Sequence, residues 1–210
     1  RLFEESLGIA RASGFADTVS VSLTWLGAHA NWRGEFTRAI DTSRQAAAAA
    51  REINDGLSEL IAGAFVCLSQ IGLGQYTEAL ATIDDGLAKS RERNNSFIAG
   101  RLTNTLGWLY QELGDFRRAV EYNREAAEVG RQAKNANVEV SSLINLSLDE
   151  LNLGDPRKAL ALMAVFMPAT GYSATCTTTV SSVGGAATAV NAAVAGSTVG
   201  SPDARNCSSI

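Results

Sequence analysis

Few residues in this chain stand at the spacings that catalytic or metal-binding chemistry requires. The single histidine, His29, has no cysteine or carboxylate at metal-ligand spacing, and a zinc site needs three or four such ligands. Cys67, Cys176 and Cys207 are odd in number and lack the close pairs of a zinc site or a disulfide framework. We therefore expect no metal site, no cofactor, and an intracellular, reducing environment.

The paired carboxylates, the paired glycines and the first cysteine also lack a catalytic arrangement. Asp84 and Asp85 are adjacent, so on a helix they point about 100° apart, which is typical of solvated surface. Gly184 and Gly185 are not followed by the Lys-Ser or Lys-Thr of a phosphate-binding loop. Cys67 takes a packed position, so we interpret it as a buried structural thiol rather than a nucleophile. The sequence predicts no catalytic residues.

Composition and charge exclude several classes of partner. The chain has 210 residues, and 18 Lys and Arg stand against 22 Asp and Glu, which gives a net charge of −4. An acidic chain offers no basic track for nucleic acid or another strongly acidic partner. Its longest apolar runs are far shorter than the roughly 20 residues that a bilayer requires. We expect a cytoplasmic protein that binds neither nucleic acid nor a membrane.

One short pattern returns every 40 residues and defines the elements that must position any site. A glycine is followed by a polar residue and then by an aromatic residue or proline, and an alanine comes three residues later. The glycines are Gly34, Gly74, Gly114 and Gly154, and the alanines are Ala39, Ala79, Ala119 and Ala159. The pattern predicts a series of helix hairpins in which the alanine permits close approach of the two helices, so that a larger side chain there would be costly.

The third unit shows the sequence pattern of such a hairpin most clearly. Four leucines share one face of its first helix, at Leu102, Leu106, Leu109 and Leu113. Gly114 can adopt the left-handed conformation that closes a helix, and Asp115 can cap the next helix. In the fourth unit Pro156 falls at the first helical position, where its missing N–H costs nothing.

A second set of turn residues separates one hairpin from the next, at 54–56, 94–95 and 135–137. Before each turn an arginine lies near the end of the second helix, and the series is Arg11, Arg51, Arg91 and Arg131. Because this register reaches back to residue 11, we expect a partial unit at 1–14 and a chain cut from a longer array. We predict a helical repeat domain over residues 1–163, with repeat units at about 17–55, 56–95, 96–135 and 136–163.

These marks resemble the tetratricopeptide repeat (TPR). The third unit matches it in order at Leu106, Gly107, Tyr110, Gly114, Asp115, Phe116, Ala119 and Ala126. The usual unit has about 34 residues, whereas this one has 40 and is similar to arrays C-terminal to the ATPase modules of bacterial signalling proteins, including adenylate/guanylate cyclases and LuxR-type regulators. The resemblance implies an all-α fold: a right-handed superhelical, TPR-like α-solenoid of about four antiparallel helix hairpins plus a leading half-repeat.

The resemblance also implies a function without catalysis. The chain would be a protein–protein interaction scaffold or a regulatory segment of a larger bacterial signalling protein, and any cyclase or ATPase activity would reside outside it. Its partner would be a protein, a peptide or a neighbouring domain of the same protein. The alternative is a sensor domain of a transcriptional activator that binds a small metabolite. The family's clamp for terminal carboxylates is not supported, because Thr24 and Ala28 stand at its positions.

The family's concave groove is lined by the first helix of each hairpin. The corresponding candidates for partner or ligand binding are Trp25, Trp32, Phe65, Arg101, Asn104, Trp108 and Asn145. Such a strip could receive an extended peptide, a helix or a small ligand. The alternative for each aromatic residue is that it forms core between adjacent hairpins. Arg101 and Asn104 fit that alternative least well.

The helical regularity ends after Met163. Residues 164–210 are dominated by Ala, Thr, Ser, Val and Gly, and Asp203 and Arg205 are their only formal charges. Such a segment has too few large apolar side chains to offset its ordering entropy. We predict an irregular low-complexity tail, either disordered or non-native sequence joined near Met163, with a weak cap over the last repeat as a third interpretation.

Overall fold

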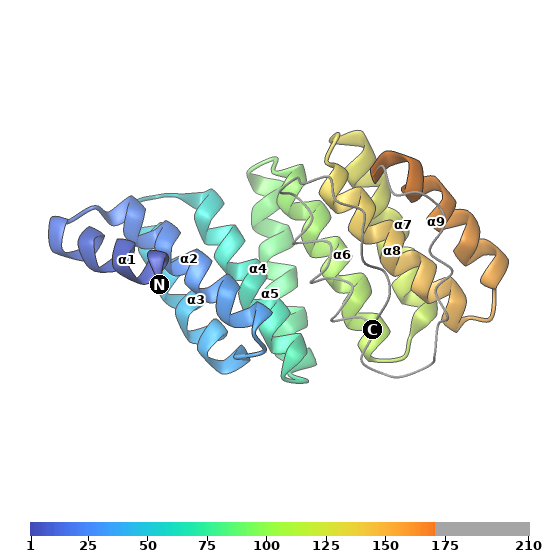
Figure 1. The fold of residues 1–210 in the computed structure, drawn as a ribbon, viewed down its shortest axis with the longest axis horizontal. Helices are drawn as coiled ribbons and strands as arrows, with labels where there is room; N and C mark the ends of the chain where they lie inside the picture. Colours follow the sequence, from blue (N-terminus) through green and yellow to red (C-terminus); the bar gives the residue numbers. More distant parts are fainter. Residues whose placement is uncertain (171–210) are drawn as a thin grey trace, which may run out of the picture. The chain divides into compact units, whose positions relative to one another are not determined.

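The structure is a computed structural model that describes the backbone of residues 1–170 and the side chains of residues 1–163. The described part is all helical (Figure 1). Its helices are α1 (Leu2–Ser13), α2 (Ala16–Trp32), α3 (Phe36–Glu52), α4 (Gly56–Gly72), α5 (Tyr76–Glu92), α6 (Ser96–Glu112), α7 (Phe116–Gln132), α8 (Ala136–Asn152) and α9 (Pro156–Thr170). None of these helices combines the length and apolar character that crossing a membrane requires.

The helices pair as hairpins, α2 with α3, α4 with α5, α6 with α7 and α8 with α9. Each helix packs on the next one in the chain, and the first helices α2, α4, α6 and α8 also contact one another in succession. This pattern of nearest-neighbour contacts is that of an α-solenoid, in which each hairpin buries its apolar faces against adjacent hairpins. The predicted fold class is thereby confirmed.

The glycine turns within the hairpins have the predicted left-handed conformation. The φ angles of Gly34, Gly74, Gly114 and Gly154 are 74°, 73°, 75° and 86°. In the third hairpin the amide of Asp115 donates to the carbonyl of Tyr110 at 2.9 Å, which closes the end of α6. The Asp115 carboxylate then accepts from the Arg118 amide at 3.2 Å, as expected of an N-cap.

The turns between hairpins use a left-handed residue that is not glycine. Asn54, Asn94 and Lys134 have φ angles of 56°, 51° and 53°. The next residue caps the following helix: Asp55 accepts from two backbone amides, and Asn95 and Asn135 each accept from one. The predicted turns between hairpins are confirmed, although Gly56 already belongs to α4, and Ala136 and Asn137 already belong to α8.

Small residues allow the helices of each hairpin to approach closely. Ala39, Ala79, Ala119 and Ala159 are all buried, as predicted. A Cβ added to Gly27 would lie 2.2 Å from Ser43 Oγ on the second helix, and one added to Gly107 would lie 2.3 Å from Asn123 Oδ1. The crossing point therefore has no room for a larger side chain.

The largest core cluster joins the second and third hairpins. It is formed by Leu60, Ala64, Cys67, Ile71, Ala79, Ile83, Ile98, Leu102, Leu106 and Leu109. Burial raises the pKa of the Cys67 thiol to about 12, so the thiol is neutral at pH 7. The interpretation of Cys67 as a buried structural thiol is confirmed.

The last described helix, α9, extends to Thr170. The predicted tail begins at residue 164, and its remainder, residues 171–210, lies outside the described residues.

Candidate interaction surface on the first helices

The seven predicted site residues all lie on first helices: Trp25 and Trp32 on α2, Phe65 on α4, Arg101, Asn104 and Trp108 on α6, and Asn145 on α8. We call this row of side chains the first-helix face. Because α2, α4, α6 and α8 contact one another in succession, the face is continuous from one hairpin to the next. The two ends of the face differ in chemistry: all three members on α2 and α4 are aromatic, whereas α6 and α8 carry Arg101, Asn104 and Asn145 together with Trp108.

Four aromatic rings form a row across α1, α2 and α4. Phe3 stacks on Trp25 with 6.4 Å between ring centroids, Trp25 lies 6.5 Å from Trp32, and Trp32 meets Phe65 edge-on at 6.2 Å. Trp25 and Trp32 remain 42% and 53% exposed, whereas Phe65 is 8% exposed. The structure therefore brings Trp25, Trp32 and Phe65 together as one surface, which we call the aromatic row.

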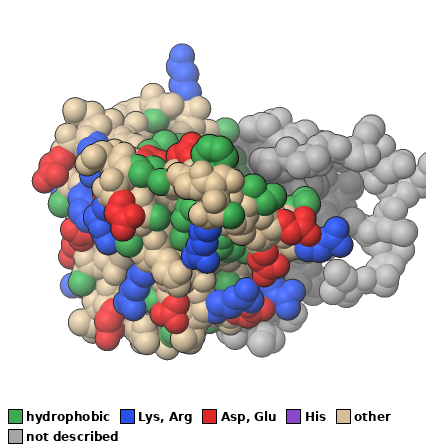
Figure 2. Space-filling view, turned by 90° about the vertical axis from the view of Figure 1, so that its left-hand side faces the viewer, with side chains coloured by type: hydrophobic (Ala, Val, Ile, Leu, Met, Phe, Trp, Pro, Cys, Tyr) green, Lys and Arg blue, Asp and Glu red, His purple; other side chains and the backbone are tan. Residues whose placement is uncertain are grey.

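Phe3 is the member of the row that sequence reasoning missed. The 40-residue register could have found it, because Phe3 is in register with Ser43, Ile83 and Asn123, all fully buried second-helix positions. Figure 2 views the end of the molecule at the left of Figure 1 and shows hydrophobic side chains across the middle of that face, with charged side chains around them.

Arg101 lies on α6 between the neighbouring first helices. Its Nη1 donates to Asn137 Oδ1 at the start of α8 at 2.9 Å, and Cys67 of α4 is close enough to influence its titration. Burial of the guanidinium lowers the pKa of Arg101 from its ordinary value. Arg101 forms no ion pair with any carboxylate in residues 1–163.

Asn104 faces its own hairpin rather than open solvent. Its Nδ2 donates to Asn123 Oδ1 at 3.0 Å, and Asn123 Nδ2 donates to Asp149 Oδ2 at 2.8 Å. Gln111 Nε2 donates to the other carboxylate oxygen of Asp149 at 2.6 Å. These contacts make a buried amide–carboxylate network between the third and fourth hairpins.

Asp149 is the charged centre of this network and is fully buried. Desolvation raises the pKa of Asp149 to about 6, although the hydrogen bonds from Asn123 and Gln111 act in the opposite direction. Sequence reasoning did not identify this residue. The available signal was its register, because the equivalent positions in the three preceding repeats are His29, Ser69 and Leu109, none of which is a carboxylate.

Trp108 and Asn145 complete the polar end of the face. Trp108 is partly buried, and its Nε1 donates to Glu112 Oε1 at 2.9 Å. Asn145 is buried, its backbone carbonyl accepts from Gln111 Nε2 at 3.0 Å, and its own Nδ2 has no acceptor among the described residues. Of the predicted residues on α6 and α8, Asn104 and Asn145 thus face the interior.

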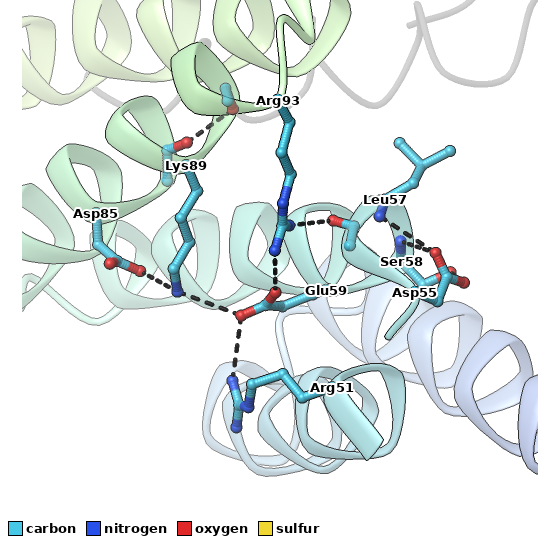
Figure 3. Close-up of polar contacts among 11 residues, drawn as sticks. Arg51, Asp55, Leu57, Ser58, Glu59, Asp85, Lys89 and Arg93 are labelled. Carbon is cyan, nitrogen blue, oxygen red and sulfur yellow. Dashed lines mark hydrogen bonds and ion pairs between the residues drawn. The ribbon is translucent and has the colours of Figure 1, made fainter. Parts of the chain in front are cut away.

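A second charged cluster lies at the junction of α3, α4 and α5 (Figure 3). Glu59 is 7% exposed and pairs with Arg51 at 3.5 Å, Lys89 at 3.2 Å and Arg93 at 3.1 Å. Burial alone would raise the pKa of Glu59, but the hydrogen bonds from Arg93 and Lys89 hold it below its ordinary value. Arg93 Nη1 also donates to the Gly56 carbonyl at 2.8 Å. Through the ion pair of Arg51 on α3 with Glu59 on α4, the cluster links the first hairpin to the second. The sequence analysis did not predict this cluster.

The remaining chemistry-bearing residues do not gather into a site. His29, Asp84 and Asp85 are exposed on separate helices or faces. Within residues 1–163, no three His, Cys, Asp or Glu side chains come close enough together to hold a metal ion.

Comparison with known proteins identifies the fold and no more. No family model matches the chain, and no curated protein matches its sequence. Among solved structures, a Rap protein complexed with Competence and Sporulation Factor matches with a TM-score of 0.67 and 13% identity over 72% of this chain. Aspartyl phosphate phosphatase F from Bacillus subtilis matches with a TM-score of 0.65 and 14% identity over 72% of this chain.

A third similar structure is BtubC from P. vanneervenii, with a TM-score of 0.63 and 16% identity over 86% of this chain and 80% of its own. The chain spans only 43% of the length of the Rap protein and 40% of the length of aspartyl phosphate phosphatase F. These likenesses, together with the repeated hairpins, show a TPR-type helical repeat fold.

Proposed function

We propose that this chain is a non-catalytic interaction scaffold whose first-helix face binds a protein or peptide partner. The aromatic row carries the proposal. Trp25 and Trp32 are 42% and 53% exposed, although their rings are held in place by Phe3 and Phe65. Large aromatic side chains in fixed, exposed positions are typical of binding hot spots, because they bury much area at little cost in side-chain entropy.

The wider context is also a proposal. The chain would serve as a regulatory segment of a larger bacterial signalling protein in the cytoplasm, and its partner would be another protein or a neighbouring domain. One protein of similar fold, the Rap protein, has been solved in complex with Competence and Sporulation Factor, which agrees in kind with a binding role for such repeats. At 13% identity, the identity of that partner does not transfer to this chain.

The small-metabolite alternative has less support. A surface hollow of about 430 Å³ lies between α5, α6 and α7 and is lined by Leu87, Thr103 and Val129 among others, none of which belongs to the aromatic row. A ligand pocket is ordinarily concave and encloses most of its ligand. A row of half-exposed rings instead suits a partner that covers a broad surface.

The experiment is a selection of random 12-residue peptides displayed on phage against the full 210-residue chain. We expect enriched peptides whose binding is lost in Trp32→Ala and Trp25→Ala proteins. Leu113→Ala is the matched control, because Leu113 is a similarly exposed large apolar residue at a hairpin turn. If binding survives both tryptophan substitutions, or if no peptide is enriched, the first-helix face is not the binding surface.

A further inference from the structure

Arg101 is a partly buried cation that lacks a counterion among residues 1–163. Its hydrogen-bond partner, Asn137, is neutral. The nearby Cys67 thiol offers no negative charge either, because burial raises its pKa to about 12 and keeps it uncharged at pH 7. A desolvated charge without a compensating partner is costly to a folded protein.

Elsewhere the chain pairs its buried charges. Glu59 has three cationic partners, and buried Glu150 pairs with Lys158 at 2.7 Å and Arg124 at 3.7 Å. Arg101 is the only arginine of residues 1–163 that is partly buried rather than exposed, and its one side-chain hydrogen bond in that range is to the neutral amide of Asn137. The pattern indicates that a counterion is supplied from outside these hairpins.

The repeat itself does not require a cation at this position. The residues in register with Arg101 in the other hairpins are Val21, Ile61 and Ser141, all uncharged. An apolar or small side chain therefore satisfies the packing of the first-helix face here. Since the same backbone position accepts valine, isoleucine or serine, the charge of Arg101 serves something other than the stability of the hairpin.

The side chains around Arg101 indicate what kind of ligand could bind there. Trp108 follows Arg101 by seven residues on the same helix, so both lie on one side of α6. Cys67, which is near Arg101, lies two residues from Phe65 at the end of the aromatic row. A ligand on Arg101 thus has Trp108 on the same helix, and the aromatic row begins with Phe65 on the neighbouring helix α4 and continues to Trp25 and Trp32 on α2.

We propose that Arg101 binds the side-chain carboxylate of a partner peptide in which one Asp or Glu is flanked by apolar residues. This inference rests on the proposed function and names the chemistry of its partner. The guanidinium fork matches a carboxylate with two parallel hydrogen bonds, and apolar residues beside it pack on Trp108 and the aromatic row. The net charge of −4 disfavours a polyacidic partner, so a single acidic residue is the fitting recognition element.

The test uses the same displayed 12-residue library, fused at the peptide C-termini so that every available carboxylate belongs to a side chain. Enriched peptides are then synthesised, and their Kd values for the full chain are measured by fluorescence anisotropy. We expect a recurring Asp or Glu beside apolar residues, and binding weakened roughly tenfold or more by Arg101→Gln. Arg117→Gln removes an equally charged but exposed residue and is expected to leave Kd unchanged.

Two further measurements separate recognition from a structural role. Replacing the peptide's Asp or Glu by its amide should weaken binding by the same factor as Arg101→Gln, and the two changes together should weaken it no further. Without peptide, Arg101→Met should raise the melting temperature, because it removes a partly buried charge that has no counterion in residues 1–163. A structural Arg101 would instead lower the melting temperature on substitution.

The outcomes distinguish this inference from the proposed function. Enriched peptides that need Trp32 but carry no carboxylate, or that bind Arg101→Gln and wild-type protein equally, overturn the role of Arg101 and leave the scaffold intact. The absence of any peptide that depends on Trp32 overturns both.

Discussion

Gln111 on α6 donates a hydrogen bond from Nε2 to Asp149 Oδ1 on α8 at 2.6 Å, and two repeats earlier Asn31 donates to Ser69 Oγ at 2.8 Å in the same register. Between these two contacts, the equivalent residues Ile71 and Leu109 belong to the main core cluster. The same pair of repeat positions thus lies between successive first helices three times. It is neutral and polar between α2 and α4, apolar between α4 and α6, and charged between α6 and α8. Only the charged form responds to pH.

The free energy of unfolding should depend on Asp149 at mildly acidic pH. Desolvation raises the pKa of Asp149 from 3.8 to about 6, so the folded chain binds this proton more tightly than the unfolded chain. Protonation of Asp149 therefore adds about 3 kcal/mol to the free energy of unfolding. This contribution is fully present below about pH 4 and is lost as the pH rises through about 6. Asp149→Asn cannot titrate and should flatten this part of the profile. Urea unfolding of both proteins between pH 4 and pH 7 measures the difference, and parallel profiles would contradict the prediction.

Removing the charge of Glu59 should destabilise the junction of the first two hairpins. Glu59→Gln leaves Arg51, Lys89 and Arg93 without their shared carboxylate. The expected loss is about 2 kcal/mol, between the small value of an exposed ion pair and the larger value of a buried one, because Glu59 is buried while its partners are partly exposed.

The control for Glu59 is Glu52→Gln, at an exposed glutamate near the end of α3. It should change the free energy of unfolding by less than about 0.5 kcal/mol. Because hydrogen bonds hold the pKa of Glu59 below its ordinary value, its contribution is present above the unfolded-state pKa and disappears as the pH falls through the folded-state pKa. Equal stability of the two variants at pH 7 would show that the cluster adds nothing.

Two glycines in helices should respond in opposite directions to alanine. A Cβ at Gly130 would lie 2.5 Å from the Glu139 amide nitrogen and 2.9 Å from its Cα, so the backbones of α7 and α8 would have to separate. Gly130→Ala should therefore cost about 2 kcal/mol. Gly63 meets nothing within 4 Å, and Gly63→Ala should stabilise the chain by roughly 0.5–1 kcal/mol through helix propensity. The melting temperatures of both variants test this prediction. A stabilising effect of Gly130→Ala would contradict the close approach of α7 and α8 at this position.

The left-handed turn residues give a further matched pair. Lys134 has a φ of 53°, a conformation that costs a residue with a Cβ more than it costs glycine. Lys134→Gly should raise the free energy of unfolding by up to about 1 kcal/mol, whereas Gly114→Ala, at a φ of 75°, should lower it by a similar amount. Denaturant unfolding of both variants measures these changes. The same sign for both would exclude the turn geometry as their cause.

The sequence by itself determined the period of the fold. Glycine turns, N-caps and small crossing residues recur every 40 positions because each requirement is local: a positive φ, an orphan amide or a helix contact close in the chain. The aromatic residues on α2 and α4 were predicted for the same reason, since their positions follow from the register.

Only the tertiary structure decided which polar side chains meet. Asn104 was predicted to line the groove, but it faces its own hairpin because Gly107 leaves space in which Asn123 reaches both Asn104 and Asp149. Contacts such as Gln111 with Asp149, or Glu59 with Arg93, join residues more than 30 positions apart. Their formation depends on how closely two helices pack and on which side chain finds a partner out of water. The sequence pattern alone does not show whether the hydrogen bonds and ion pairs of a polar side chain offset the cost of removing it from water.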